Sequence, residues 1–137
     1  MAKKVLIVED DQFIREMYAL ILRKRQYEVV ESADGAVGLV EARKGGFDII
    51  LLDLMMPQMD GLGFLRELQK QPAKIPNGPI IVMSNLAYSD AKEEAIKLGA
   101  KDFLVKADLD PKDVLGIVEK ALGDSDKLTH STSSESS

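Results

Sequence analysis

Apolar residues gather in five short runs along the chain. The runs are rich in Val, Ile and Leu, and within most of them the apolar residues follow one another without polar residues between. A strand buried on both faces has this continuous pattern, whereas a strand with one wet face alternates. We therefore predict five buried β-strands, at Val5–Val8, Val29–Val30, Ile49–Leu52, Ile80–Met83 and Phe103–Val105.

Between these runs, apolar residues recur at the spacing of an α-helix. A shorter and weaker helical pattern covers Ala36–Arg43. The clear stripes are Ile14, Met17, Tyr18 and Ile21; Leu65 and Leu68; Ala91, Ala95 and Leu98; and Val114, Ile117, Val118 and Ala121. Strands that alternate with helices predict an α/β fold, in which a parallel sheet carries helices on both faces through right-handed crossovers.

The chain has the length of one domain. With 137 residues, folding can bury about two thirds of the unfolded surface, enough for a core without disulfides. We predict one domain over residues 1–123. The following residues, 124–137, read DSDKLTHSTSSESS and have no apolar periodicity, so burial cannot offset their ordering entropy, and we expect a disordered Ser/Thr-rich tail. A tail regulated by phosphorylation or used for docking is the alternative.

Composition removes several classes of function. The chain has no cysteine, and its one histidine, His130, lies in the polar tail. Disulfides, thiolate sites, multi-histidine metal sites and Ser-His-Asp catalysis are therefore not expected. A net charge of −5 has the wrong sign for direct binding of nucleic acid. No apolar run approaches the roughly 20 residues of a membrane span, and no signal peptide is visible, so we expect a cytoplasmic protein without a membrane partner.

Polar side chains with useful chemistry follow the predicted strands. They are Glu9, Asp10 and Asp11 after the first strand, Asp53 after the third, Ser84 and Asn85 at the fourth, and Lys106 after the fifth. Ligands of parallel α/β sheets bind beyond the carboxyl ends of the strands, so these groups should converge. Each residue alone could be a helix cap, a turn or a surface residue, but their joint placement favours one functional site.

Carboxylates held close together repel one another unless a cation lies between them. A hard divalent ion such as Mg²⁺, which prefers oxygen ligands, relieves this repulsion. A site with such a metal, an aspartate nucleophile, a lysine and a hydroxyl suits transfer of a phosphoryl group. The metal offsets oxygen charge, the lysine stabilises the transferred group, and the hydroxyl donates to one of its oxygens.

Four stretches, VLIVEDD, DIILLDLMMPQMDG, IIVMSN and GAKDFLVK, resemble the receiver domain of bacterial two-component response regulators. The resemblance covers about residues 3–122. It implies a doubly wound, flavodoxin-like sheet of five parallel strands in the order 2-1-3-4-5, with five flanking helices. It further implies that Asp53 accepts the phosphoryl group, with Ser84 and Lys106 as the catalytic hydroxyl and lysine.

The same resemblance implies the metal ligands and a switch. Mg²⁺ would be held by Asp10, by Asp53, by Glu9 mostly through water, and by the backbone carbonyl of Met55. Phe103 matches the aromatic switch position, whose side chain turns inward when the hydroxyl residue of the site moves. Phosphorylation would thus change a partner surface through a two-state element.

The resemblance also implies partners. The phosphoryl donor would be a sensor histidine kinase or a histidine phosphotransfer protein, docking at Ile14 and Met17 and near Ala107, Asp108 and Leu109. Core packing is the alternative role of Ile14 and Met17. A downstream protein target or a second copy of the chain would bind the fourth helix, fifth strand and fifth helix. We expect a signalling module rather than an enzyme in its own right.

Three residues depart from the family pattern. Asn85 follows Ser84 where a small residue is usual, Ala107 follows Lys106 where a proline reached through a cis bond is common, and Phe103 lacks a phenolic hydroxyl. We expect altered access to the acyl phosphate, a different loop after the lysine, and a switch that works by packing. No essential chemical group is lost.

Rival classes fit less well. An Asp-nucleophile phosphatase would carry its nucleophile after the first strand with a second Asp two residues on, whereas Asp53 is followed by Leu54 and Met55. A flavin module would need a phosphate-cradling loop where this chain has acidic residues. A pseudo-receiver, which binds partners without phosphorylation, remains the alternative function. Apolar Met55 and Leu86 beside the site predict slow self-hydrolysis of the acyl phosphate.

Overall fold

The computed structural model describes the backbone of residues 2–85 and 89–129, and strands alternate with helices throughout this part of the chain. Every element predicted from the apolar pattern is present. In chain order the elements are β1 (Lys4–Val8), α1 (Gln12–Lys24), β2 (Glu28–Ser32), α2 (Gly35–Lys44), β3 (Ile49–Leu52), α3 (Gly61–Lys70), β4 (Ile80–Ser84), α4 (Ser89–Lys97), β5 (Asp102–Val105), the short 3₁₀ helix η1 (Lys106–Asp108) and α5 (Asp113–Thr129).

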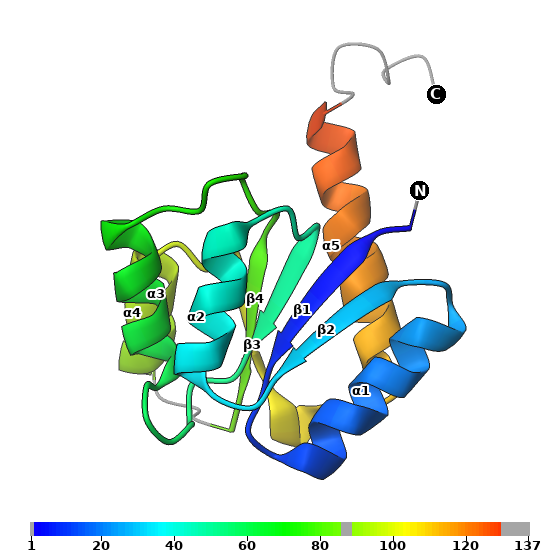
Figure 1. The fold of residues 1–137 in the computed structure, drawn as a ribbon. Coiled ribbons are helices and arrows are strands. Elements are labelled where there is room, and N and C mark those ends of the chain that lie inside the picture. Colours follow the sequence, from blue (N-terminus) through cyan, green and yellow to red (C-terminus); the bar gives the residue numbers. More distant parts are fainter. Residues whose placement is uncertain (1, 86–88, 130–137) are drawn as a thin grey trace.

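The five strands form one parallel sheet in the order β2-β1-β3-β4-β5, which confirms the predicted topology. Helices α1 and α5 lie on one side of the sheet, and α2, α3 and α4 lie on the other (Figure 1). The strand order reverses direction between β1 and β3, because the chain first runs outward to β2 and then returns across β1 to β3. Their carboxyl ends are therefore the expected place for a ligand.

Alternate residues of the central strands pack into two separate hydrophobic cores, one on each face of the sheet. In β1, Leu6 and Val8 belong to the core beneath α2, α3 and α4, whereas Val5 and Ile7 belong to the core beneath α1 and α5. All four are almost completely buried. A strand that must be apolar on both faces produces the unbroken runs seen in the sequence.

Three helices begin at an aspartate that caps the first turn. The side chains of Asp11, Asp34 and Asp60 accept backbone N–H groups three residues ahead, at 3.1, 2.9 and 2.8 Å. Such caps satisfy N–H groups that have no partner within the helix. Asp11 is therefore a helix cap, one of the structural roles that an acidic residue after β1 can have.

Helix α5 is longer than the predicted domain boundary at residue 123 allows. It ends at Thr129, so residues 124–129 are helical instead of belonging to a disordered tail. Extending a helix that is already formed adds one hydrogen bond for each residue that is fixed, so its free-energy cost is small. The rest of the predicted tail, residues 130–137 with His130, lies outside the described residues. No described helix is long and apolar enough to cross a membrane.

Candidate functional site

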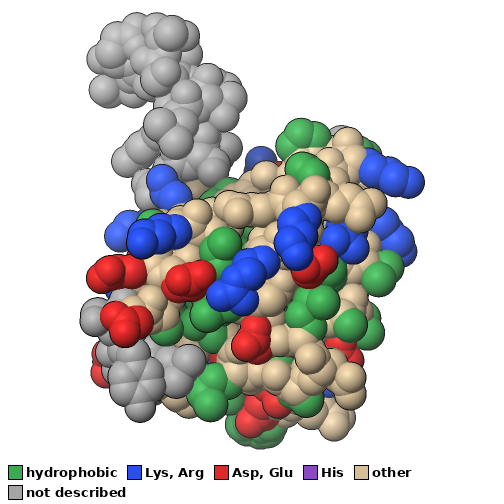
Figure 2. Space-filling view, turned by 90° about the vertical axis from the view of Figure 1, so that its left-hand side faces the viewer, with side chains coloured by type: hydrophobic (Ala, Val, Ile, Leu, Met, Phe, Trp, Pro, Cys, Tyr) green, Lys and Arg blue, Asp and Glu red, His purple; other side chains and the backbone are tan. Residues whose placement is uncertain are grey.

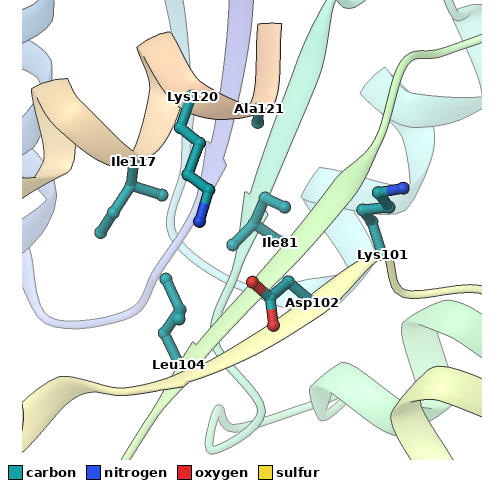
Figure 3. A pocket seen from close by; sticks show the side chains of 7 residues that line it. All are labelled: Ile81, Lys101, Asp102, Leu104, Ile117, Lys120 and Ala121. Atoms are coloured by element: carbon teal, nitrogen blue, oxygen red, sulfur yellow. The ribbon is translucent and has the colours of Figure 1, made fainter. Parts of the chain in front are cut away.

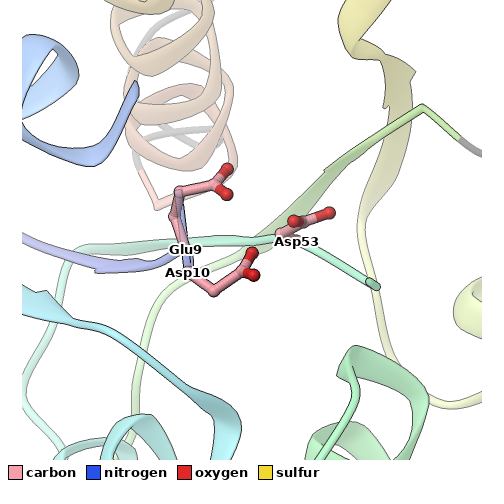
Figure 4. A group of neighbouring side chains, drawn as sticks. All are labelled: Glu9, Asp10 and Asp53. Atoms are coloured by element: carbon pink, nitrogen blue, oxygen red, sulfur yellow. The ribbon is translucent and has the colours of Figure 1, made fainter. Parts of the chain in front are cut away.

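Three carboxylates meet where β1 and β3 end. Glu9 and Asp10 follow β1, Asp53 follows β3, and one oxygen of each lies within 4.8 Å of the others. Figure 4 shows the carboxylates of Asp10 and Asp53 on the same side of the strand ends. Glu9 and Asp53 are 3% and 6% exposed, whereas Asp10 is open to solvent. The structure thus brings together the three acidic side chains that the sequence singled out.

Main-chain hydrogen bonds fix the positions of the two buried acids. The N–H of Glu9 donates to the carbonyl of Ser32 in β2, and the N–H of Asp53 donates to the carbonyl of Val8 in β1, each at 3.0 Å. Parallel pairing therefore continues one residue beyond each strand. The carboxylate of Glu9 also accepts the N–H of Asp11 at 3.1 Å. The site is built on the rigid sheet edge.

Lys106 places an ammonium group among these carboxylates. Its Nζ donates to Glu9 Oε1 and lies 3.2 Å from Asp53 Oδ2, and its side chain is only 10% exposed. The cluster of three carboxylates and one ammonium carries a formal charge of −2 when all four groups are ionised. One lysine thus offsets only part of the acidic charge, and a further cation would be favoured here.

Burial shapes the protonation of this cluster. It raises the pKa of Glu9 to about 7, and the negative charge of Asp53 acts in the same direction, against the opposing hydrogen bond from Lys106. Burial alone would lower the pKa of Lys106, but its hydrogen bond to Glu9 and the charge of Asp53 outweigh burial and raise the pKa. Lys106 therefore stays charged at neutral pH, and Glu9 holds a proton for part of the time.

Ser84 and Phe103 lie on the two strands beyond β3. Ser84 is the last residue of β4, is completely buried and lies opposite Val105, the residue before Lys106. Phe103 on β5 is buried in the core beneath α2, α3 and α4. The structure therefore places the hydroxyl at the same edge as the lysine, and the aromatic ring is packed inward. The switch role of both residues stays a prediction.

The loop after Asp53 approaches the site closely. The N–H of Met55 donates to Asp53 Oδ1 at 3.2 Å, and the Met55 side chain is largely exposed beside an open hollow of about 470 Å³. A side chain at Gly61 would not fit, because its Cβ would lie 2.6 Å from the carbonyl oxygen of Asp53. Leu86, the other residue expected to influence hydrolysis, lies outside the described residues.

The residues expected to bind partners lie around this edge with different exposure. Ile14 and Met17 on α1 are half-buried, and Ile14 packs against the core beneath α1 and α5. Ala107 and Asp108 are exposed in η1, whereas Leu109 is half-buried. No described peptide bond is cis, and the loop after Lys106 forms a 3₁₀ turn.

The sequence did not indicate a role for two residues of α1, Phe13 and Arg15. Phe13 is 70% exposed and lies next to Ile14 but outside the helical stripe, so the apolar pattern gave no reason to single it out. Arg15 hydrogen-bonds to the backbone of Glu9. No local sequence signal predicts that contact, because it depends on how α1 packs beside the loop.

A separate cavity of about 180 Å³ lies between β4, β5 and α5. Figure 3 shows Lys120 and Asp102 directed toward this space and Lys101 pointing away from it. Its apolar walls are Ile81, Leu104, Ile117 and Ala121. None of these residues belongs to the acidic cluster. The cavity lies in the β5–α5 surface that the resemblance assigns to output partners.

The donor set fits a hard divalent cation. Three carboxylates can each offer an oxygen from a small region, one of them from an exposed side that leaves room for water. Hard cations such as Mg²⁺ use one or two carboxylates and several waters. The net negative charge of the cluster, and the carboxylate oxygens that these three residues offer, agree with that preference.

A parallel sheet of this order, with a buried aspartate, two more acids and a lysine at its carboxyl edge, defines the receiver class of α/β domains. The family model of the response regulator receiver domain matches residues 5–119. The chain therefore belongs to the response regulator receiver family, as its motifs indicated. Receivers of this family act in two-component signalling.

Individual relatives agree with this assignment. The chemotaxis protein CheY of Thermotoga maritima is 40% identical over 107 residues, covering 77% of this chain and 87% of that protein. A CheY-like receiver domain protein from Methanospirillum hungatei has a similar structure, with a TM-score of 0.81, 26% identity and coverage of 93% and 98%. The transcriptional activator protein PfeR of Pseudomonas aeruginosa is 36% identical over 103 residues, which span 75% of this chain but 32% of PfeR.

Proposed function

We propose that the chain is a phosphorylatable receiver, in which Asp53 accepts a phosphoryl group from a phosphohistidine. The arrangement of Asp53 carries this proposal: its buried carboxylate contacts Lys106 and lies within 4.8 Å of the carboxylates of Glu9 and Asp10. A pseudo-receiver has no need to keep a nucleophile, a cation and metal ligands together. Their joint presence supports phosphorylation over a purely binding role.

Mg²⁺ is the proposed cofactor. Asp10 and Asp53 would bind it directly, Glu9 mostly through water, and the carbonyl of Met55 would be a further ligand. When bound, the metal would offset the negative charge of the carboxylates and of the incoming phosphoryl oxygens. The exposed side of Asp10 and the adjacent hollow give the donor access from solvent.

The residues of the chain divide the remaining chemistry. An oxygen of Asp53 attacks phosphorus, an O–P bond forms, and the N–P bond of the donor breaks with its electron pair passing to the imidazole nitrogen. Lys106 balances charge on the transferred group, and the hydroxyl of Ser84 donates to one of its oxygens. The N–H of Met55, which donates to Asp53 Oδ1, orients the nucleophile.

The expected partners follow from this chemistry. A sensor histidine kinase or a histidine phosphotransfer protein would supply the phosphoryl group, docking at Ile14 and Met17 and near Ala107, Asp108 and Leu109. A downstream protein or a second copy would recognise the phosphorylated state. On the face covered by α2, α3 and α4, acidic and basic side chains are mixed (Figure 2).

Intact mass tests the proposal. The protein is incubated with acetyl phosphate, a small acyl-phosphate donor, in Mg²⁺ or in EDTA, and Asp53→Asn is treated alike. Asp34→Asn is the matched control, because asparagine also caps a helix well and Asp34 lies outside the acidic cluster. We expect one labile phosphoryl group in the wild type and in Asp34→Asn, only with Mg²⁺, and none in Asp53→Asn. No gain, with donors including a phosphorylated kinase, would favour the pseudo-receiver.

A further inference from the structure

The guanidinium of Arg15 on α1 lies against the acidic loop, which is formed by Glu9, Asp10 and Asp11 between β1 and α1. Its Nη1 donates to the backbone carbonyl of Glu9 at 2.9 Å, and its Nε donates to Glu31 Oε1 at 3.3 Å. The Arg15 side chain is only 13% exposed. A buried guanidinium needs both its counter-charge and its hydrogen-bond acceptors, and here a backbone carbonyl of the site is one of those acceptors.

The carbonyl that Arg15 holds belongs to the peptide unit joining Glu9 to Asp10. The N–H of Glu9 is already tied to Ser32 in β2, so the contact with Arg15 fixes the other end of the same residue. The Asp10 carboxylate makes no hydrogen bond or ion pair with the described part of the chain. Its direction therefore depends on the backbone, which is where Arg15 acts.

Glu31 makes this contact compatible with cation binding. An unpaired guanidinium beside the acidic cluster would repel a divalent ion. Glu31 on β2, which lies opposite Ile7 of β1, pairs with Arg15 and offsets its charge. Arg15 can then hold the loop with part of its positive charge offset, since Glu31 also pairs with Arg23.

Arg23, further along α1, provides an internal comparison. It also pairs with Glu31, through Oε2 at 3.1 Å, and donates to a backbone carbonyl, that of Val29, at 3.0 Å. It thus makes the same two kinds of contact as Arg15. Arg23 joins α1 to β2, however, and within the described part of the chain it makes no hydrogen bond or ion pair with Glu9, Asp10 or Asp11.

We propose that Arg15 is a positioning residue for the metal-binding and phosphoryl-accepting site, and that it acts by holding the Glu9–Asp10 peptide. This inference rests on the proposed function. Groups that orient metal ligands from behind typically change metal affinity by about 10- to 100-fold when they are removed. We expect Arg15→Met to weaken Mg²⁺ binding by about tenfold or more, and Arg23→Met to leave it within about twofold.

Titration calorimetry with MgCl₂ at pH 8 tests this, with urea unfolding in EDTA as a measure of stability. The set comprises the wild type, Arg15→Met, Arg23→Met and Arg15→Lys. We expect both methionine variants to lose stability, but only Arg15→Met to lose Mg²⁺ affinity. Arg15→Lys, which can still donate to the Glu9 carbonyl, should recover part of it.

The outcomes separate the inference from the proposed function. Failure of the wild type to bind Mg²⁺ overturns the metal site itself. Mg²⁺ binding that is equal in Arg15→Met and the wild type, or weakened equally in Arg15→Met and Arg23→Met, overturns the positioning role alone. If Arg15→Met does not fold, Arg15→Lys is compared with Arg23→Met. When the two variants are equally stable, the positioning role requires that Arg15→Lys bind Mg²⁺ more weakly than Arg23→Met, and equal binding overturns it.

Discussion

Replacing Asp53 with asparagine should make the metal-free protein more stable, although it removes the proposed nucleophile. The asparagine side chain has the same shape, and its Oδ1 can still accept the N–H of Met55. What changes is the charge, and also the group that faces Lys106, where an amide NH2 replaces the carboxylate oxygen that lies 3.2 Å from its Nζ. Asp53 lies within 4.8 Å of two carboxylates and 3.2 Å from the ammonium of Lys106.

These distances set the size of the effect. At an effective dielectric constant of about 20, two charges at the upper limit of 4.8 Å that separates these carboxylate oxygens repel by roughly 3.5 kcal/mol, and charges 3.2 Å apart attract by roughly 5 kcal/mol. Two repulsions exceed one attraction by about 2 kcal/mol. Solvent around exposed Asp10 reduces this surplus, whereas the neutral amide costs less to bury than the carboxylate that it replaces. We expect Asp53→Asn to gain about 1–2 kcal/mol.

Urea unfolding at about pH 8, where Glu9 with its pKa of about 7 is charged, measures the difference. In EDTA the asparagine variant should have the higher midpoint. In saturating Mg²⁺ the wild type should gain more, since a ligand at about 100 times its Kd adds about 2.7 kcal/mol. Asp34→Asn should behave like the wild type. A lower midpoint for Asp53→Asn in EDTA would refute the reasoning, because it would mean that Lys106 outweighs the carboxylate repulsion.

Three further changes test other parts of the site. Burial raises the pKa of Glu9 from 4.5 to about 7, so the native state binds this proton more tightly than the unfolded state does. The free energy of unfolding without metal should therefore fall by on the order of 3 kcal/mol as pH rises from about 4.5 to about 7. Glu9→Gln should flatten that part of the urea midpoint profile, and an unchanged profile would contradict the assignment. Lys106→Met should keep Mg²⁺ binding in calorimetry but slow phosphoryl uptake, measured by mass, by about 100-fold or more; uptake at the normal rate would exclude a catalytic lysine. Gly61→Ala should lower stability by about 1–3 kcal/mol, because its Cβ would lie 2.6 Å from the Asp53 carbonyl, while Gly116→Ala, with open space around it, should gain about 0.5–1 kcal/mol in thermal or urea unfolding.

Much of the fold was predictable because parallel strands buried on both faces appear in the sequence as unbroken apolar runs. The unbroken runs at Ile49–Leu52 and Val5–Val8 identified the central strands, and the structure confirms both. The acidic residues and the lysine could then be assigned to one edge, since parallel strands all end on the same side. Helix α5 extends past the boundary predicted at residue 123 and ends at Thr129, in a segment that has no apolar stripe to indicate it.

Contacts made between elements were not predictable in the same way. Arg15 has an unremarkable place in the first turn of α1, and its bond to the carbonyl of Glu9 exists only because the helix folds back over the loop. The apolar ring of Phe13 faces solvent for the same reason, because the orientation of α1 on the sheet turns Ile14 inward instead.

The three consecutive acids after β1 show most clearly which features the sequence determines and which only the tertiary structure decides. The sequence by itself determined that carboxylates follow this strand, and only its resemblance to the receiver family distinguished Asp10, as a direct metal ligand, from Glu9, as a ligand mostly through water. In the tertiary structure Asp11 caps α1, Asp10 faces solvent, and Glu9 is buried against Lys106, which lies 97 positions away along the chain. Burial and long-range charge pairing depend on how β5 and α1 pack around the loop, and neighbouring residues along a chain do not encode that packing.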